Sequence, residues 1–173
     1  MQPPVSSSDL GITYGLGKSS LGFVLVALSQ RGVCAVFLGD DAASLTAQIQ
    51  SRFPGASLTS VPSLDELVAQ VVGAIEDPTV GLGLALDLRG TAFQRRVWHE
   101  LEKIPAGTTT SYAAIAERIG SPQSARAVAH ACAANLAALA IPCHRVVRAD
   151  GGISGYRWGV ARKRQLLARE AHR

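Results

Sequence analysis

The sequence contains few cysteines, few charged residues and no long apolar run. Its three cysteines, Cys34, Cys132 and Cys143, include no Cys-x-x-Cys pair. That count fits neither a disulfide framework nor a four-ligand zinc site, and it indicates free thiols. The longest apolar run, residues 21–28, is far shorter than the ~20 residues that a membrane span requires. Residues 1–10 lack the basic region and apolar core of a secretory signal, so we expect a cytoplasmic protein.

The composition is that of a folded protein with an uneven charge. Hydrophobic residues make up 47% of the 173 positions, which is enough for an ordinary core. Residues 1–87 contain three Lys or Arg and eight Asp or Glu, whereas residues 88–173 contain fourteen and five, giving net charges of −5 and +9. We therefore predict two domains, 1–87 and 88–173. The second would contact a polyanion such as nucleic acid, unless its charge is only a solvated surface.

The first half predicts a scaffold of strands followed by helices. Strand-like segments at residues 12–16, 21–28 and 33–38 are separated by turn compositions at 17–20 and 29–32, which predicts three antiparallel strands. Two helices should follow, at residues 43–53 and from a capping box at 63–66 to about residue 75. Residues 80–86 alternate as a further strand or an extended linker.

The second half predicts several short helices in succession. Residues 91–94 form a capping box that opens a helix ending before Pro105. Ser111 should cap a helix closed by Gly120, and Ser121 with the proline after it should open another that reaches residue 134. Two helices joined so tightly are a candidate helix-turn-helix, with the second helix facing DNA.

The surface of that second helix is unusual for a DNA reader. Its side chains are mostly alanine, and Arg126 is its only long cationic residue. Reading base edges in the major groove requires several Arg, Asn or Gln side chains, so sequence-specific recognition is unfavourable. A narrow helix suits the minor groove, where one long side chain can act as a wedge. The alternative for Arg126 is an exposed charge in solvent.

The segment at residues 141–147 holds a thiol, an imidazole and a guanidinium side by side. Positive neighbours can stabilise a thiolate, which makes Cys143 a candidate nucleophile next to His144 and Arg145. From this segment alone a buried, unreactive cysteine is the favoured interpretation, because free cysteines are usually buried and behave as small apolar residues.

The second half resembles the O6-alkylguanine-DNA alkyltransferase family. The most specific matches are PCHRVV at residues 142–147 and GYRWG at 155–159. Further matches lie at residues 89–94, 97–98, 104–105, 111–112, 125–128, 135, 166–167 and 170. The first half resembles the amino-terminal part of the alkyltransferase unit of bacterial adaptive-response proteins. The resemblance implies an α/β fold: an RNase H-like antiparallel-sheet domain with helices, and a mostly helical, winged-helix-like domain. Whether the chain acts alone or within a longer bifunctional protein stays open.

The resemblance also implies a reaction and its residues. Family members transfer an alkyl group irreversibly from O6 of guanine, and also from O4 of thymine, to a cysteine that matches Cys143. His144 would activate this thiol through a water, with Glu170 holding the other nitrogen of the imidazole. Tyr112 would protonate the leaving base. Asn135 would join the recognition helix to the active-site segment.

Further residues are implied for DNA and for the base pocket. Arg126 would fill the gap left by a flipped nucleotide, which agrees with the wedge inferred above. Additional DNA contacts are implied at Tyr112, Ser111, Ala125, Ala127 and Arg145, and pocket walls at Tyr156, Ser154, Trp158 and Val146. Because many relatives carry a smaller residue where Trp158 stands, we expect a narrow pocket that handles methyl groups well and benzyl groups poorly. No cofactor and no metal are expected.

The implied partner is double-stranded DNA containing O6-alkylguanine, contacted in the minor groove with little sequence specificity by a monomer. No membrane partner is expected, and the location would be the bacterial cytoplasm, on the nucleoid. Two alternatives remain. One is a non-enzymatic helix-turn-helix protein that binds lesions or regulates transcription. The other is a Cys/His hydrolase, which is disfavoured because adjacent residues project in different directions on regular structure.

Overall fold

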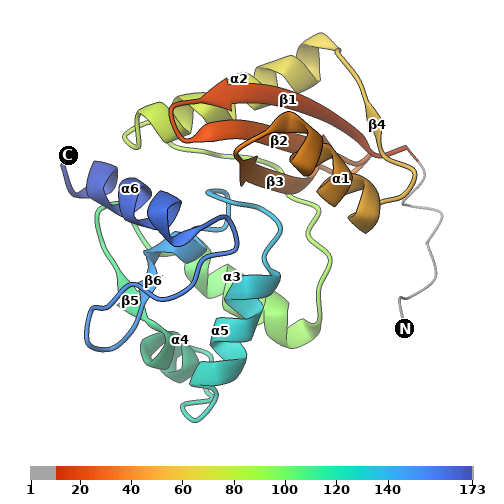
Figure 1. Cartoon of the computed structure of the whole chain (residues 1–173). Helices are drawn as coiled ribbons and strands as arrows, with labels where there is room; N and C mark the ends of the chain where they lie inside the picture. The colour runs from red at the N-terminus through yellow and green to blue at the C-terminus, as the bar shows by residue number, and fades with distance from the viewer. Residues whose placement is uncertain (1–10, 173) are drawn as a thin grey trace.

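The computed structural model describes residues 11–172 (Figure 1). A sheet with two helices forms the upper part of the molecule in Figure 1, and a group of short helices forms the lower part. Residues 1–10, where no secretory signal is expected, lie outside the described residues. The expected fold class is confirmed: an α/β chain with a mainly antiparallel sheet followed by a mostly helical part.

The sheet has the strand order β3-β2-β1-β4. Strands β1 (Thr13–Ser19), β2 (Gly22–Leu28) and β3 (Val33–Gly39) are antiparallel, as predicted. The first turn is shorter than predicted, because β1 continues to Ser19 and pairs it with Gly22, which has a φ of +106°. A short fourth strand, β4 (Ser57–Leu58), runs parallel to β1 and was not predicted.

Two helices cover opposite faces of this sheet. Helix α2 (Pro62–Glu76) lies close to β1, where a Cβ on Gly17 would sit only 2.5 Å from Val68. Helix α1 (Ala42–Arg52) packs on the other face, with Leu45 against Gly39. The capping box predicted at residues 63–66 is wrong: the N-cap is Val61, two residues before Ser63, and α2 begins at Pro62 without a side-chain cap. Proline suits this position because the first helical N–H has no partner within the helix.

The second part is built from helices α3 (Ala92–Glu102), α4 (Tyr112–Arg118), α5 (Ala125–Ala134) and α6 (Val160–Ala171). The predicted caps at Thr91 and Ser111 are confirmed, the first as a complete capping box. The predicted start of α5 at Ser121 is wrong, because residues 121–124 form a turn and Ser124 is the N-cap. Strands β5 (Thr110–Ser111) and β6 (Val146–Val147) pair in parallel beside a 3₁₀ turn, η2 (Cys143–Arg145).

The two parts share one continuous hydrophobic core. Residues 80–91 are extended and touch the sheet at a single bridge between Leu86 and Val33. A second bridge joins Val36 of β3 to Ala137 in the loop that leads to Cys143. The predicted boundary after residue 87 falls in this extended segment, and independent folding of two domains stays a prediction. Among the described residues, no helix is long and apolar enough to cross a bilayer.

Candidate active site and DNA interface

The site is centred on Cys143, the first residue of η2. Its side chain is 5% exposed and lines a cavity of about 420 Å³, within the range of about 300–1,000 Å³ typical of small-molecule sites. The other lining residues are Tyr112, Ala129, Cys132, Ala133, Ser154, Gly155, Tyr156 and Arg157. Helix α5 therefore forms one wall of this cavity, and the loop before α6 forms another.

Asn135 fixes the thiol relative to α5. It ends that helix as its C-cap and is completely buried. Its Nδ2 lies 3.3 Å from Sγ of Cys143 and 3.0 Å from the carbonyl oxygen of Ile141, and it donates to both. Its Oδ1 accepts from the backbone N–H of Ala137 at 2.8 Å. One side chain thus joins the end of the helix to the cysteine loop, which is the position expected from the sequence.

His144, Glu170 and Arg145 form a buried network behind the thiol. Nε2 of His144 lies 2.8 Å from Oε1 of Glu170, in the last turn of α6. Arg145 donates to both oxygens of the same carboxylate, through Nη2 at 2.8 Å and Nε at 3.1 Å. Nδ1 of His144 is buried and has no hydrogen-bond partner among residues 11–172.

Burial and hydrogen bonds shift the pKa values of His144, Glu170 and the neighbouring Cys143. Burial lowers the pKa of His144 despite the opposing charge of Glu170, so the imidazole is neutral near pH 7. Burial would raise the pKa of Glu170, but hydrogen bonds from His144 and Arg145 outweigh it and lower that pKa to about 2. Burial raises the pKa of Cys143, opposed by the Asn135 hydrogen bond and the charge of Lys163. The resting thiol is therefore protonated beside a neutral base and a charged carboxylate.

We expect this network to make the protein sensitive to acid. His144 and Glu170 both have lower pKa values in the folded state than in the unfolded state. The folded state therefore binds fewer protons than the unfolded state and loses stability as the pH falls. The loss should begin below about pH 6.5 through His144, and it should steepen below about 4.5 as the unfolded carboxyl protonates, continuing towards about 2. Urea unfolding across this pH series checks it. The step below pH 4.5 should shrink in Glu170→Gln, and equal stability at pH 7 and pH 3 would contradict the assignment.

Tyr112 and Ser154 lie side by side on the lining of the cavity. The Tyr112 hydroxyl lies 2.6 Å from Oγ of Ser154, and burial raises the pKa of the phenol. Tyr112 opens α4 directly after Ser111, whose Oγ accepts from the backbone N–H of Ala114. The phenol therefore keeps its proton at neutral pH and can donate it into the cavity.

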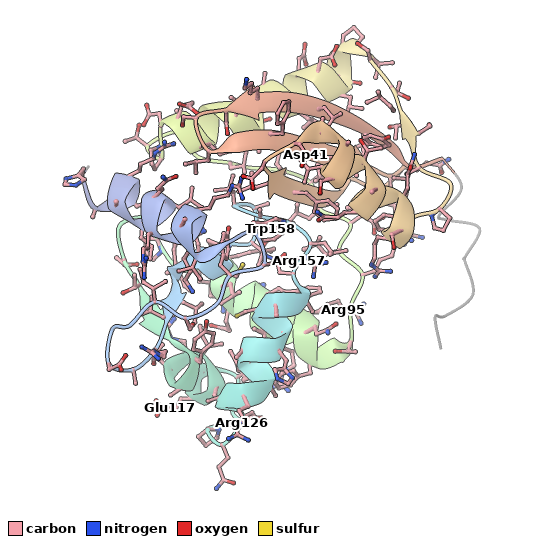
Figure 2. All side chains as sticks on the ribbon, viewed as in Figure 1. Asp41, Arg95, Glu117, Arg126, Arg157 and Trp158 are labelled. Carbon is pink, nitrogen blue, oxygen red and sulfur yellow. The ribbon has the colours of Figure 1, made fainter. Side chains whose placement is uncertain are left out.

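Helices α4 and α5 form the helix-turn-helix. The exposed side of α5 presents Arg126, Ala127, His130 and Ala133, while Ala125 is half-buried. Figure 2 shows Arg126 at the lower end of the molecule. The indole N–H of Trp98 donates to the carbonyl of Ala131 at 2.8 Å and holds α5 against α3. A narrow, alanine-rich face with one long cation is the surface predicted from the sequence.

Three residues need correction. Arg145 is predicted to contact DNA, but its guanidinium is occupied by Glu170 and by the carbonyl of Ile104 at 2.7 Å. Val146 and Trp158 are predicted to wall the pocket, yet neither lines the cavity. Val146 lies buried in β6, and Trp158 packs edge-on behind Tyr156, with ring centroids 5.2 Å apart. Any effect of Trp158 on alkyl size must therefore act through Tyr156.

Sequence reasoning missed Lys163, Cys132 and Arg157. Lys163 is 1% exposed, and its ammonium donates to the carbonyl of Val146 at 2.7 Å. Its charge lowers the pKa values of Cys143 and Cys132 against the effect of burial. Nothing in the basic run at the start of α6 marks one lysine as buried. No group of three or more His, Cys, Asp or Glu among residues 11–172 could hold a metal.

The second part of the chain combines a helix-turn-helix with a cavity that a buried cysteine lines, an arrangement typical of a DNA-binding protein. The family described as "6-O-methylguanine DNA methyltransferase, DNA binding domain" matches residues 92–172. The chain is 36% identical over 168 residues to the "Methylated-DNA--protein-cysteine methyltransferase" of Candida albicans, covering 91% of this chain and 95% of that protein. The chain belongs to the methylated-DNA–protein-cysteine methyltransferase family.

Two further relatives extend the comparison. Identity is 51% over 164 residues to the Escherichia coli "Bifunctional transcriptional activator/DNA repair enzyme Ada", covering 94% of this chain and 46% of that protein. The chain thus spans about half the length of the first curated relatives it matches. The structure of Mycobacterium tuberculosis OGT in complex with DNA superposes with a TM-score of 0.78 at 33% identity, covering 92% of this chain and 93% of that one.

Proposed function

We propose that this protein repairs DNA by direct reversal, moving an alkyl group from O6 of guanine, or O4 of thymine, to Sγ of Cys143. The observation that carries the proposal is the buried thiol on the wall of a cavity that also borders the helix-turn-helix. In this step the bond between the alkyl carbon and O6 breaks and a carbon–sulfur bond forms. The electron pair stays on the base, and the thiol proton ultimately replaces the alkyl group. Each protein molecule reacts once.

The cavity requires the base to leave the duplex. Cys143 is 5% exposed, so its sulfur cannot approach an alkyl carbon that is stacked inside a helix. Flipping a nucleotide costs a few kcal/mol and costs less where the base pair is already damaged. Arg126, on the exposed side of α5, has the length and position to occupy the gap in the stack. Ser111, Ala125 and Ala127 would lie against the same minor groove.

The thiol needs a base because its pKa is raised by burial. With Nε2–H of His144 donating to Glu170, Nδ1 is left as the proton acceptor, and it has no protein partner in the described residues. A water joining Sγ to this Nδ1 would carry the proton, since buried polar groups without a protein partner are commonly satisfied by ordered water. Lys163 would help to stabilise the thiolate.

The leaving base needs a proton donor. The Tyr112 hydroxyl projects into the cavity and shares a short hydrogen bond with Ser154. A phenol with a raised pKa donates a hydrogen bond to a ring nitrogen and transfers its proton as negative charge develops there. Tyr156 forms the neighbouring wall and Trp158 packs against its ring, so a preference for methyl over benzyl groups would act through the position of Tyr156. The proposal places the protein on the bacterial nucleoid as a monomer.

Restoration of guanine tests this function. A duplex whose restriction site is blocked by one O6-methylguanine is incubated with increasing protein and then digested. We expect cleavage to rise linearly and to stop at one duplex per protein molecule, because the acceptor is consumed. Repeated turnover, or no cleavage with DNA bound, would contradict single-use transfer. The second outcome would favour the non-enzymatic lesion binder.

Replacing Arg126 with alanine should slow transfer on duplex DNA by about tenfold, since about 1.4 kcal/mol of lost stabilisation of the flipped state suffices. Single-turnover rates on duplex and single-stranded oligonucleotides measure the effect, which should be smaller on the single strand because no stacked gap is filled. Arg164→Ala, which removes an exposed charge from α6, is the matched control. Equal slowing on both substrates would rule out a wedge.

A further inference from the structure

The few basic residues of the acidic first half are not spread evenly. Residues 1–87 contain only Lys18, Arg31 and Arg52 as Lys or Arg. Arg31 lines a cavity of about 300 Å³ together with Arg89 and Arg95, at the junction with the second part. Arg52 lies on the ring of Phe53, 5.4 Å from its centroid, and Arg89 lies 5.8 Å from the same centroid. Lys18 lies elsewhere, beside Phe23 near the β1–β2 turn.

These arginines continue towards the active site through Arg157. The guanidinium of Arg157 lines the Cys143 cavity and donates to the carbonyl of Ala133, on the exposed side of α5, at 3.0 Å. Burial lowers the pKa of Arg157, and the positive charge of Arg52 lowers it further, so the two groups are electrostatic neighbours. Figure 2 shows Arg157 between the sheet and α5, with Arg95 to its right. We define Arg157, Arg52, Arg89, Arg95 and Arg31 as the arginine track.

The track has little negative charge to balance it. Among residues 11–172, Asp87 is the one carboxylate that lines the arginine cavity, and it lies 3.5 Å from Arg89 and 2.6 Å from Ser29. Arg31, Arg52 and Arg95 are exposed, and their guanidinium groups make no hydrogen bond or ion pair among residues 11–172. Like charges placed together without partners repel, which an anionic ligand relieves. The track begins at the wall of the Cys143 cavity that α5 also forms. The anion that fits it is therefore the phosphate backbone of the DNA that α5 would bind.

We propose that phosphates flanking the flipped nucleotide bind along the arginine track, so that the amino-terminal part of the chain contacts DNA through Arg31 and Arg52. This inference rests on the proposed function, because it assumes DNA on the exposed side of α5. Arginine suits the role, since its planar guanidinium donates two parallel hydrogen bonds to a phosphate. Such contacts hold position and carry no sequence information, in keeping with an alanine-rich recognition helix.

The salt dependence of DNA binding tests the track. Dissociation constants of Arg31→Ala, Arg52→Ala, the double variant and wild type are measured on one lesion-containing duplex between 50 and 200 mM salt. Each phosphate contact contributes about 0.9 to the slope of log K against log salt, so each single variant should lose about 0.9 and the double variant about twice that. The advantage of wild type over a single variant should then shrink about threefold across this range. Lys18→Ala removes the same charge from the same half and should leave the slope unchanged.

Duplex length gives a second readout. On a duplex that ends at the recognition helix, wild type and the three variants should bind equally, because no phosphate then reaches Arg31 or Arg52. Equal slopes for all variants on the long duplex, with wild-type melting temperatures, would overturn the inference, as would an equal loss in Lys18→Ala. Transfer by the wild-type protein is measured in parallel. Transfer with unchanged slopes refutes the track alone, whereas absence of transfer refutes the proposed function.

Discussion

A Cys143→Ser variant transfers no alkyl group and still binds lesion-containing DNA. The hydroxyl that replaces the thiol keeps a hydrogen bond to Asn135 within reach, but it is a far weaker nucleophile at neutral pH. The cavity walls on α5 and α4 stay in place, so the base is still received. Single-turnover assays should show loss of transfer below detection, and titration of the same duplex should show a dissociation constant within a few-fold of wild type.

Cys34→Ser is the matched control for this result. Cys34 is also buried, and burial with the nearby charge of Asp87 raises its pKa to about 12, so its thiol stays protonated. It lies in β3, away from the Cys143 cavity. The control should transfer one alkyl group per molecule. Transfer by Cys143→Ser at the wild-type level would move the acceptor to another residue.

Replacing Glu170 with alanine should lower the free energy of unfolding by about 3 kcal/mol and slow transfer. Removing one partner from a buried ion pair costs about 3–5 kcal/mol. The lower end applies because Arg145 retains 17% side-chain exposure. His144 would also lose the acceptor for its Nε2–H, and with it the hydrogen bond that fixes the ring and leaves Nδ1 as the proton acceptor. Urea unfolding measures the first effect, and the dependence of the transfer rate on pH measures the second.

Two further variants serve as controls for Glu170→Ala. Glu66→Ala removes an exposed carboxylate from α2 and should change stability by no more than about 0.5 kcal/mol. Glu170→Gln keeps an oxygen for His144 but loses the charge opposite Arg145, so its stability should fall between wild type and Glu170→Ala. If Glu170→Ala unfolds at the wild-type urea concentration, the network contributes nothing to folding. If the pH profile of transfer is also unchanged, Glu170 has no role in orienting His144.

The geometry separates the three classes of function that the sequence leaves open. In a Cys/His hydrolase the imidazole would contact the thiol directly, whereas the side-chain partner of Sγ here is Asn135 and the partner of His144 is Glu170. A pure lesion binder needs the helix-turn-helix but has no use for a thiol on the cavity wall beside a proton acceptor. The family comparisons disfavour this second class too.

Sequence patterns within a few residues predict most helices and strands well. Pairings between residues far apart in the sequence leave no such pattern and are missed. Thr91 and Ser111 were identified as caps because the side chain and the N–H that it accepts from are three residues apart. The cap at Ser63 was wrong because the same pattern arises within a first helical turn that Pro62 already opens. Strands β5 and β6 pair two residues each across 36 positions, so no local pattern could reveal them.

The same division holds for the site. The candidate residues for the chemistry, in the PCHRVV segment and at Glu170, are predicted through resemblance to a family and not through spacing. The DNA contact of Arg145 is implied by the family resemblance, yet the fold uses its guanidinium to hold the carboxylate of Glu170. Lys163 went unnoticed because only the packing of α6 reveals which of its basic residues is buried.

The most direct test of the central claim is the mass of the peptide that contains Cys143. The protein is incubated with a duplex carrying one O6-methylguanine, digested and analysed by mass spectrometry. We expect one added CH2 unit, located on Cys143, with Cys132 and Cys34 unmodified and the DNA strand lighter by the same unit. A repaired strand with the added mass on another residue, or DNA bound tightly with no mass change in the protein, would contradict the account.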